Sequence, residues 1–553
     1  MGLKQEKIGR SGEMAEASIA SAGDIPVQSH KMHRTLNWTH AFWIASGTPV
    51  LVLFSIGAVA SAAGNISAGV WIISMLIGFV QCFTYAEISG LFPRKSGGAS
   101  VYGAIAWVPY GKMLGPISVW ANWFSWSPVL AIGSGLAAGY VLNLLFPPDA
   151  LIRTWQITLF DLSFIKEGVV VRLNATFFLG LALMLAVFAI QHRGILKAAR
   201  VQMIIAIAVL LPLLLIGIVP LFTGDLHSEN FTPFVPLIRD AAGNPANGAW
   251  DMVGMTTFMA CLLLAAWSTY PFETAVCYVS EFKNPGYDTV RALVYSGLLC
   301  IAFYTLVPVA FQGYLGLNGL LEPGIYDGTG VGQVMTQMVG AGPVLGNIII
   351  ATLTLSICLV VMTAMAGSSR TLFQGSHDGW LPKYLSRVNS HGAPVAAMWT
   401  DLAVNAVLLS ISDYVFLIVL ANTTYMIFVF LNLQAGWLHR IDRPDAERPY
   451  RASTWLIAVG AICGFLNLLI MGWGADFWGQ RVLLTSLLIV AGIIPIFAYR
   501  HYVTDRGSFP PWMQADLEEN GMPIRRRAGI LPYVTLIAGA LTIYVGHLLA
   551  TYQ

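Results

Sequence analysis

Charged side chains are scarce in this sequence, and their scarcity decides its class. Only 10% of the 553 residues are Asp, Glu, Lys or Arg, while 56% are hydrophobic. Soluble globular proteins carry about 25% charged residues. The composition therefore excludes an ordinary soluble domain, and a formal net charge of +2 gives no reason to expect a nucleic-acid partner.

Metal-binding and catalytic motifs are also missing. The six cysteines all fall inside apolar stretches, with neither metal-ligand spacing nor an extracellular pairing pattern. The ten histidines lie mostly in tails and loops, and there is no H-E-x-x-H motif. We therefore expect no cofactor, no bound metal and no enzymatic activity.

Long apolar runs, in contrast, are abundant. A membrane-spanning helix needs roughly 20 mainly apolar residues. Candidate spans lie near residues 41–63, 69–92, 113–146, 173–192, 201–222, 252–281, 289–313, 341–366, 394–411, 413–437, 453–473, 481–500 and 530–550. The sequence thus predicts an all-α polytopic membrane protein with 12 to 13 transmembrane helices, embedded in a lipid bilayer. Residues 1–38 are polar, lack the apolar core of a signal peptide and are expected to form a disordered cytoplasmic tail.

Lysine and arginine predict the orientation of these spans. With the N-terminus inside and thirteen alternating spans, 25 of the 30 Lys and Arg residues fall on the N-terminal side. The five others are Arg153, Lys166, Arg172, Arg239 and Arg481. The positive-inside rule then puts the N-terminus in the cytoplasm. We expect a multi-pass protein of the cytoplasmic membrane whose C-terminus lies outside.

Two of the spans are interrupted. The first contains "WIASGTPVLVLFSIG" and the sixth contains "WSTYPFE", with Pro271. The interruption of the first span comprises Ser46, Gly47, Thr48 and Pro49. Proline removes a backbone donor and breaks a helix, and irregular backbone at membrane depth survives only where it lines a cavity or is buried in protein. Because the two spans lie five apart, they run in opposite directions, as in a five-plus-five inverted repeat.

This repeat suggests a division of the chain. We expect a transporter core over residues 39–437, with a first half at about 39–222 and a second half at about 252–437. Residues 438–553 would add further C-terminal transmembrane helices. A simple proline kink in each span remains the alternative to a binding site.

Glu273 lies two residues after the proline of the sixth span. A carboxylate inside a membrane span costs roughly 2.5–3.5 kcal/mol on insertion scales and by default marks function. It could face the amine of a substrate, or it could carry a proton. A structural role, with hydrogen bonds to Thr269 or Tyr278, is the third reading.

Other acids in the membrane are weaker signals. Glu87 and Glu281 lie near the cytoplasmic ends of spans, where Arg and Lys are close, so gate or anchor pairs are expected. Asp401 has Asn405 one turn away in the ninth span, and a helix–helix hydrogen bond is at least as plausible there as a site.

Four motifs along the chain resemble the amino acid–polyamine–organocation superfamily of transporters. They are "YAEISGLFPRKSGGASVYGAI" after span 2, "WSTYPFETAVCYVSEFKNP" around span 6, "HDGWLPKYLSRVNSHGAPVAAM" after span 8 and "RPDAERPYRA" after span 10. The resemblance runs from about Trp43 to Arg451. It implies the fold of the leucine transporter and alternating-access transport of an amino acid or amine, coupled to protons or to a counter-substrate.

Within that superfamily, "WSTYPFE" is most similar to the arginine–agmatine and putrescine–ornithine antiporters. The match implies that Trp267 forms a gate or cation–π surface and that Ser268 and Thr269 line the site. The substrate-binding candidates are Ser46, Gly47, Thr48, Pro49, Trp267, Ser268, Thr269, Tyr270 and Glu273. The coupling and gate candidates are Glu273, Glu87 and Met362.

The chain also departs from the superfamily pattern. The usual Gly-x-Gly of the first break is replaced by "TPVLVLF", so proline builds both breaks, and span 5 lacks the buried lysine of some relatives. Sodium coupling through Thr363, Ser368 or Ser369 is a weaker alternative, and a channel is weaker still. The substrate, the choice between symport and exchange, and the oligomeric state are not specified by the sequence.

Overall fold

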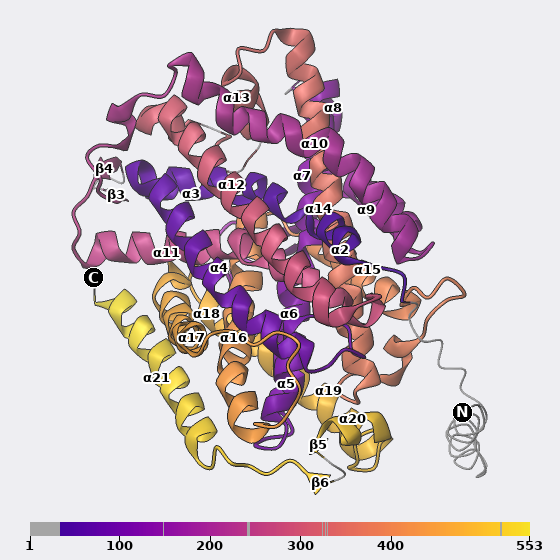
Figure 1. Cartoon of the computed structure of the whole chain (residues 1–553). Coiled ribbons are helices and arrows are strands. Elements are labelled where there is room, and N and C mark those ends of the chain that lie inside the picture. The colour runs from indigo at the N-terminus through magenta and orange to yellow at the C-terminus, as the bar shows by residue number, and fades with distance from the viewer. Residues whose placement is uncertain are drawn as a thin grey trace.

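The computed structural model describes residues 34–552 except 148, 240–243, 323, 327, 329 and 520–521. Its described part is a bundle of long helices with three short two-stranded sheets (Figure 1). Ten segments are long and apolar enough to cross a membrane, and two shorter apolar helices accompany them. The predicted all-α polytopic membrane protein is therefore confirmed. Most of the predicted tail, residues 1–33, lies outside the described residues.

The first half of the chain contains the first interrupted helix. Its elements are α2 (Trp38–Ala45), η1 (Thr48–Leu51), α3 (Val52–Ala63), η2 (Gly64–Ile66), α4 (Ser67–Gly90), α5 (Ala99–Trp107), α6 (Leu114–Trp126), α7 (Pro128–Leu145), α8 (Leu151–Thr154), α9 (Ala175–Gln191) and α10 (Ile195–Thr223). Asn37 begins α2 with a reciprocal capping box, its side chain accepting from the backbone N–H of His40. Pro128 separates α6 from α7 within the third predicted span.

The second half contains the second interrupted helix. Its elements are η3 (Ser228–Phe231), α11 (Met252–Thr269), η4 (Pro271–Glu281), α12 (Pro285–Leu320), α13 (Val331–Gln337), α14 (Pro343–His377), η5 (Lys383–Ser386), α15 (Val395–Leu409) and α16 (Tyr414–Asp442). The N-cap carboxylates Asp251 and Asp413 begin α11 and α16 by accepting backbone N–H groups.

The C-terminal part adds helices beside this core. They are α17 (Thr454–Gly474), η6 (Asp476–Trp478), α18 (Val482–Ala491), α19 (Ile493–Ala498), the π-helical η7 (Tyr499–Thr504), α20 (Pro511–Asp516) and α21 (Leu531–Thr551). In Figure 1, α21 packs along α17 at the edge of the bundle.

The strands lie in the connections. An antiparallel hairpin joins β1 (Gln156–Asp161) to β2 (Val170–Asn174), and two smaller ones pair β3 (Leu237–Arg239) with β4 (Pro245–Asn247) and β5 (Glu518–Glu519) with β6 (Met522–Pro523).

The segment from α2 to α4 crosses the bundle twice. The backbone N–H of Leu36 donates to Glu281 over 2.9 Å, and Lys95 pairs with Asp378 just past α14, so both ends of the segment lie at one end of the bundle. We call this end the N-terminal face. Gly64, at the turn, has a positive φ of 63° and abuts Leu237 at the other end.

The far end of α21 lies at that opposite end, which we call the C-terminal face. His547 lies 3.5 Å from Asp476, which follows the end of α17, and Trp478 donates its indole N–H to the carbonyl of Ala260 in the first half of α11. The two ends of the described chain therefore lie on opposite faces, as an odd number of crossings requires.

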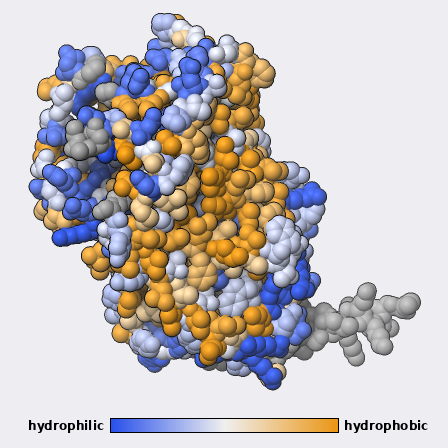
Figure 2. Space-filling model, turned by 90° about the vertical axis from the view of Figure 1, so that its left-hand side faces the viewer, coloured by the Kyte–Doolittle hydropathy of each residue, from blue (hydrophilic) through white to orange (hydrophobic). Residues whose placement is uncertain are grey.

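Apolar side chains form the outer surface around the middle of the molecule. Figure 2 shows a broad hydrophobic band across this side, with hydrophilic residues gathered at the two ends. Exposed Leu, Ile, Val and aromatic side chains occur on most of the long helices. Such a band is what a bilayer of about 30 Å hydrocarbon thickness requires.

Candidate functional site

The first helix breaks between α2 and α3. Pro49 has no N–H for the carbonyl of Ala45 four residues earlier. The Thr48 hydroxyl replaces that donor, at 2.8 Å from the Ala45 oxygen, and the Ser46 hydroxyl donates to Trp43 over 2.6 Å. Gly47 is required by packing, because a Cβ there would lie 2.4 Å from Oγ1 of Thr363 on α14.

The second break lies between α11 and η4. Tyr270 ends the α-helix and Pro271 begins a 3₁₀-helix of 11 residues that runs to Glu281. Runs of 3₁₀-helix longer than three or four residues are uncommon and often mark a hinge or strain. The proline thus changes the helix type over the whole segment that carries Glu273.

The two breaks contact each other directly. The Ser268 hydroxyl lies 2.7 Å from that of Ser55 and 3.1 Å from the carbonyl of Leu51. Tyr304 of α12 brings its hydroxyl to 2.7 Å from the Thr48 carbonyl and also contacts the Ser268 carbonyl. Residues from both breaks therefore meet around one tyrosine, which the sequence analysis missed because an isolated tyrosine in span 7 carries no motif.

Glu273 is buried, with only 1% of its surface exposed. Its Oε1 accepts from the indole N–H of Trp126 on α6 and from the hydroxyl of Tyr425 on α16, each over 3.3 Å. Its Oε2 has no hydrogen-bond partner among the described residues, and no Lys, Arg or His of that part of the chain forms an ion pair with it. One carboxylate oxygen therefore remains available.

The neighbours of Oε2 are small or polar. Gly98, at the start of α5, has no side chain, and a Cβ there would lie 3.9 Å from Oε2 and 3.6 Å from Nδ2 of Asn122. Oδ1 of Asn122 also lacks a partner among the described residues. Two acceptors without a partner among the described residues thus belong to side chains beside Gly98, an arrangement that suits a donor-rich or cationic group.

The remaining substrate-binding candidates face different ways. Trp267 donates its indole N–H to the backbone carbonyl of Ser125 on α6 over 3.3 Å, and its ring lies against Phe54 of α3. Thr269 pairs with Ser74 on α4, and the Tyr270 hydroxyl donates to Asn467 on α17 over 2.9 Å. The structure therefore brings Trp267 and Ser268 toward the first break or α6, and turns Thr269 and Tyr270 toward α4 and α17.

The structural reading of Glu273 named two hydrogen-bond partners. Thr269 is engaged by Ser74, and the Tyr278 hydroxyl has no partner among the described residues. The carboxylate instead uses Trp126 and Tyr425, which come from spans far away in sequence.

The acids near the N-terminal face form ion pairs. Glu87 binds Arg440 through two hydrogen bonds of 2.8 and 2.6 Å and lies 3.3 Å from Arg448. Glu281 binds Arg370 in the same two-point manner. These pairs join α4 to the end of α16 and η4 to α14, as anchors or gates at this face would.

The other gate and ion candidates do not converge. Met362 accepts a hydrogen bond at its carbonyl from Gln191 on α9. The Thr363 hydroxyl donates to Ile44 beside the first break, the Ser369 hydroxyl donates to Met365 within its own helix, and Ser368 donates to Asp401. The three proposed sodium ligands thus have three separate partners.

Asp401 bridges three helices. Its Oδ1 accepts from Trp123 over 2.9 Å and from Ser127 over 2.6 Å, and its Oδ2 accepts from Ser368. Asn405 adds a hydrogen bond of 2.8 Å to Ser127. The expected helix–helix link is present, and every Asp401 oxygen has a partner, in contrast to Glu273.

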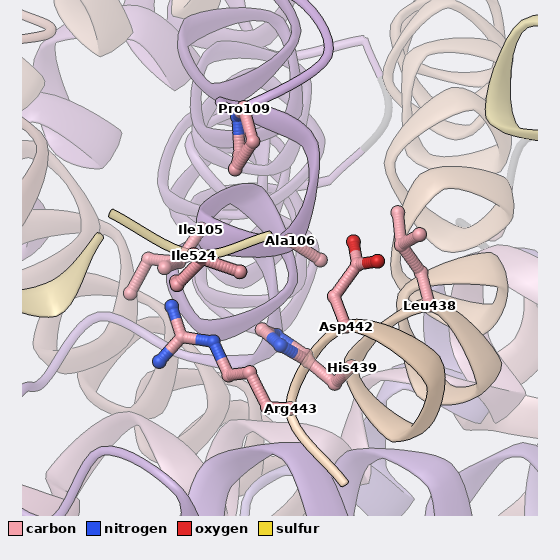
Figure 3. Close-up of a pocket in the computed structure, with 8 residues that line it drawn as sticks. All are labelled: Ile105, Ala106, Pro109, Leu438, His439, Asp442, Arg443 and Ile524. Atoms are coloured by element: carbon pink, nitrogen blue, oxygen red, sulfur yellow. The ribbon is translucent and has the colours of Figure 1, made fainter. Parts of the chain in front are cut away.

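A small hollow at the N-terminal face is separate from these residues (Figure 3). Its lining residues are Ile105, Ala106, Pro109, Leu438, His439, Asp442, Arg443 and Ile524. Asp442 already accepts from Tyr110 over 2.9 Å and from the backbone of Ala528 over 3.0 Å, and His439 contacts the Tyr102 carbonyl. The hollow is a seam between packed segments rather than a ligand site.

Comparisons with known proteins find one matching family model and several relatives. The family model described as "Amino acid permease" matches residues 36–498. A branched-chain amino acid permease of Lactococcus lactis is 25% identical over 439 residues, which cover 77% of this chain and 85% of the relative. A polyamine transporter of Oryza sativa is 25% identical, covering 74% of this chain and 67% of the relative. A putative arginine/ornithine antiporter of Escherichia coli is 26% identical, covering 75% and 81%.

Proposed function

The chain belongs to the amino acid permease family, and from that premise we propose that its substrate is a cationic amino acid or related amine held by Glu273. Membership makes the chain a secondary transporter of amino acids or amines, not an enzyme. The finer proposal concerns the charge of the substrate and the residue that binds it.

One observation carries this proposal: Oε2 of Glu273 has no hydrogen-bond partner in the described part of the chain, although the side chain is buried. An isolated ionised carboxylate is costly in an apolar environment and is ordinarily paired. A substrate ammonium or guanidinium would supply the missing donor, and Asn122 offers a second acceptor. Trp126 and Tyr425 would hold the carboxylate in place through Oε1.

The relatives support a cationic substrate without specifying it. The printed names include arginine/ornithine antiporters and a polyamine transporter, whose substrates carry a side-chain or terminal cation. They also include branched-chain amino acid permeases. The relatives are about equally distant from this chain, with about a quarter of their residues identical, so their names do not choose between the two substrate classes. The choice therefore rests on the chemistry of the site.

The same carboxylate offers a coupling mechanism. When the site returns without substrate, Glu273 must be neutralised, either by a counter-substrate cation or by a proton. Exchange and proton coupling are thus two ways of meeting one electrostatic requirement.

The second candidate is a proton-coupled carrier of neutral amino acids. In that case the unpaired Oε2 would carry the proton during transport, and the branched-chain permease relatives favour it. The difference from the first candidate is whether Glu273 contacts the substrate.

For the placement in the membrane, we propose that the N-terminal face is cytoplasmic and that residues 39–222 and 252–437 form the two halves of the core. The Lys and Arg asymmetry supports the orientation. The breaks at Pro49 and Pro271, one in each half, support the division.

Uptake into proteoliposomes tests the substrate class. Purified wild type, Glu273→Gln and the exposed-loop control Glu167→Gln would be given labelled arginine, putrescine or leucine, with unlabelled counter-substrate or a proton gradient inside. We expect wild type and Glu167→Gln to take up a cationic compound and Glu273→Gln to lose it. Leucine uptake driven by a proton gradient would favour the second candidate. In that case Glu273→Gln would lose the proton-driven uptake but would still exchange labelled for unlabelled leucine.

A further inference from the structure

A segment of the C-terminal part lies across the N-terminal face. Residues 505–518, which we call the strap, include α20 and follow the π-helical η7. Figure 1 places α20 at the end of the bundle beside α19, away from the C-terminal face. The strap lies outside the membrane-spanning helices and contacts the loops that join several of them.

Lys95 is the first of these contacts. Its Nζ lies 2.6 Å from Oδ1 of Asp378 and 2.8 Å from Oδ2 of Asp516 in the strap. Lys95 follows α4, and Asp378 directly follows α14. The strap therefore adds a second carboxylate to an ion pair that ties together the ends of two transmembrane helices.

The strap also contacts the end of α14. The ring of Trp512 stacks on His377 with centroids 4.5 Å apart, and its indole N–H donates to the His377 carbonyl over 2.8 Å. Lys383, in η5, pairs with Asp505 over 3.0 Å.

Two further contacts reach other helices. Arg443, just past α16, donates to the backbone carbonyl of Asp516. Lys112, between α5 and α6, donates to Gly507 over 3.3 Å and lies over the ring of Phe509. One segment thus connects the ends of α4, α14 and α16 and the turn before α6.

The loop that contains Lys95 continues to residues that lie beside Glu273. Two residues after Lys95, the backbone N–H of Gly97 donates to the carbonyl of Cys277 over 3.0 Å. A Cβ on Gly98 would lie 2.9 Å from Sγ of Cys277 and 3.9 Å from Oε2 of Glu273. Access to Glu273 from the N-terminal face therefore requires residues 95–98 to move away from η4 and α14.

We propose that the strap is a latch that holds the N-terminal face closed and controls how often it opens toward Glu273. Alternating access needs parts of the bundle to separate around the binding site. Lys95 cannot leave Asp378 while Asp516 still holds it against the same face. The latch depends on the transport cycle of the family and not on which substrate Glu273 takes.

Cys277 offers a reporter that needs no substrate. The other five cysteines would be replaced, and the rate at which a membrane-impermeant methanethiosulfonate modifies Cys277 from the N-terminal face would be measured. A Cys277→Ser protein gives the background. A failure of the proposed substrate class would leave this rate unaffected, so the two proposals can fail separately.

The disrupting variant is Asp516→Lys, which places a cation beside Lys95. Its matched control is Glu518→Lys, the same charge reversal at an exposed position of the same strap. We expect Asp516→Lys to raise the modification rate of Cys277 several-fold and Glu518→Lys to leave it unchanged. Equal rates in wild type and a folded Asp516→Lys protein would overturn the latch.

A locking experiment keeps the proposal testable if Asp516→Lys does not fold. The changes His377→Cys and Trp512→Cys would be made in the Cys277 reporter protein, and a cleavable bis-maleimide would join the two new thiols. The reporter protein without these two changes is the control for direct reaction of the reagent with Cys277. We expect cross-linking to slow Cys277 modification several-fold and cleavage to restore it. A cross-linked protein whose Cys277 reacts at the uncross-linked rate would show that the strap need not move.

Discussion

The hydroxyl of Tyr304 lies 2.7 Å from the carbonyl oxygen of Thr48, in the middle of the first broken helix. The same hydroxyl contacts the Ser268 carbonyl next to the second break, and its ring stacks on Trp71 with centroids 5.6 Å apart. A hydroxyl has a single proton, so Tyr304 shares it between the two carbonyls, and this sharing requires both breaks to hold their positions. It is therefore a positioning residue for the two interruptions.

Removing this hydroxyl should destabilise the protein. Tyr304→Phe leaves a buried carbonyl without its donor, which costs about 1–3 kcal/mol. Thermal unfolding in detergent would measure the loss against Tyr314→Phe, a half-buried tyrosine of the same helix. If the two variants unfold at the same temperature, the Tyr304 hydroxyl does not hold the breaks together.

The space beside Glu273 should tolerate no side chain. Gly98 has a φ of 88°, and a Cβ there would lie 2.9 Å from Cys277. Gly98→Ala is expected to lose both stability and ligand binding. Gly224→Ala is the control, because Gly224 also has a positive φ, 80°, but has nothing within 4 Å of the added Cβ. Equal effects of the two changes would mean that only backbone strain, about 1–3 kcal/mol at such positions, is being measured.

The two buried acids should respond differently to neutralisation. Asp401 accepts from Trp123, Ser127 and Ser368, so Asp401→Asn breaks a satisfied network and should cost about 1–3 kcal/mol of stability. One oxygen of Glu273 has no partner among the residues that the structure describes, so Glu273→Gln should unfold close to the wild-type temperature. The prediction fails if Glu273→Gln is the less stable of the two.

The ion pair under the strap should be insensitive to pH above the range in which a histidine changes charge. Burial alone would raise the pKa of Asp378, but Lys95 outweighs it and the pKa falls below 3.8. Burial alone would lower the pKa of Lys95, but Asp378 and Asp516 outweigh it and the pKa rises above 10.5. The depressed Asp378 stabilises the fold above its ordinary pKa and loses that effect as the pH falls through its lower folded value. The raised Lys95 contributes below its ordinary pKa and loses its contribution as the pH rises through its higher folded value.

The imidazole of His377 lies 3.8 Å from Asp378, and a histidine changes charge between about pH 5 and pH 8. The stability difference between wild type and Asp378→Asn should therefore be constant above that range, between about pH 8 and pH 9. Unfolding temperatures of both proteins at several pH values in this window measure it. A difference that shrinks steadily across the window would contradict the assigned pKa directions.

Much of the architecture could be predicted from the sequence, because apolar length and proline act locally. The thirteen apolar runs each correspond to helical segments, and Pro49 and Pro271 mark the two interruptions. What could not be predicted is the direction of side chains after the second break. A 3₁₀-helix turns more per residue than an α-helix, so neither the length of η4 nor the orientation of Glu273 follows from residue spacing.

The hydrogen-bond and ion-pair partners of the candidate residues could not be predicted from the sequence either. Trp126 and Tyr425 reach Glu273 from positions 147 and 152 residues away. Nothing in the local sequence of Asp516 indicates that it meets Lys95 across the N-terminal face. Such contacts depend on how the helices pack, and the single sequence carries no pattern for that.

The most direct test of the central claim is ligand-induced thermal stabilisation of detergent-purified wild type and Glu273→Gln. Arginine, ornithine, putrescine, leucine and serine would be compared, since a ligand at about 100 times its Kd stabilises by roughly 2.7 kcal/mol. The account predicts that a cationic compound stabilises the wild type and not Glu273→Gln. Equal stabilisation of both proteins by a cationic compound, or by neutral amino acids alone, would contradict the assignment of Glu273 as the partner of the substrate cation.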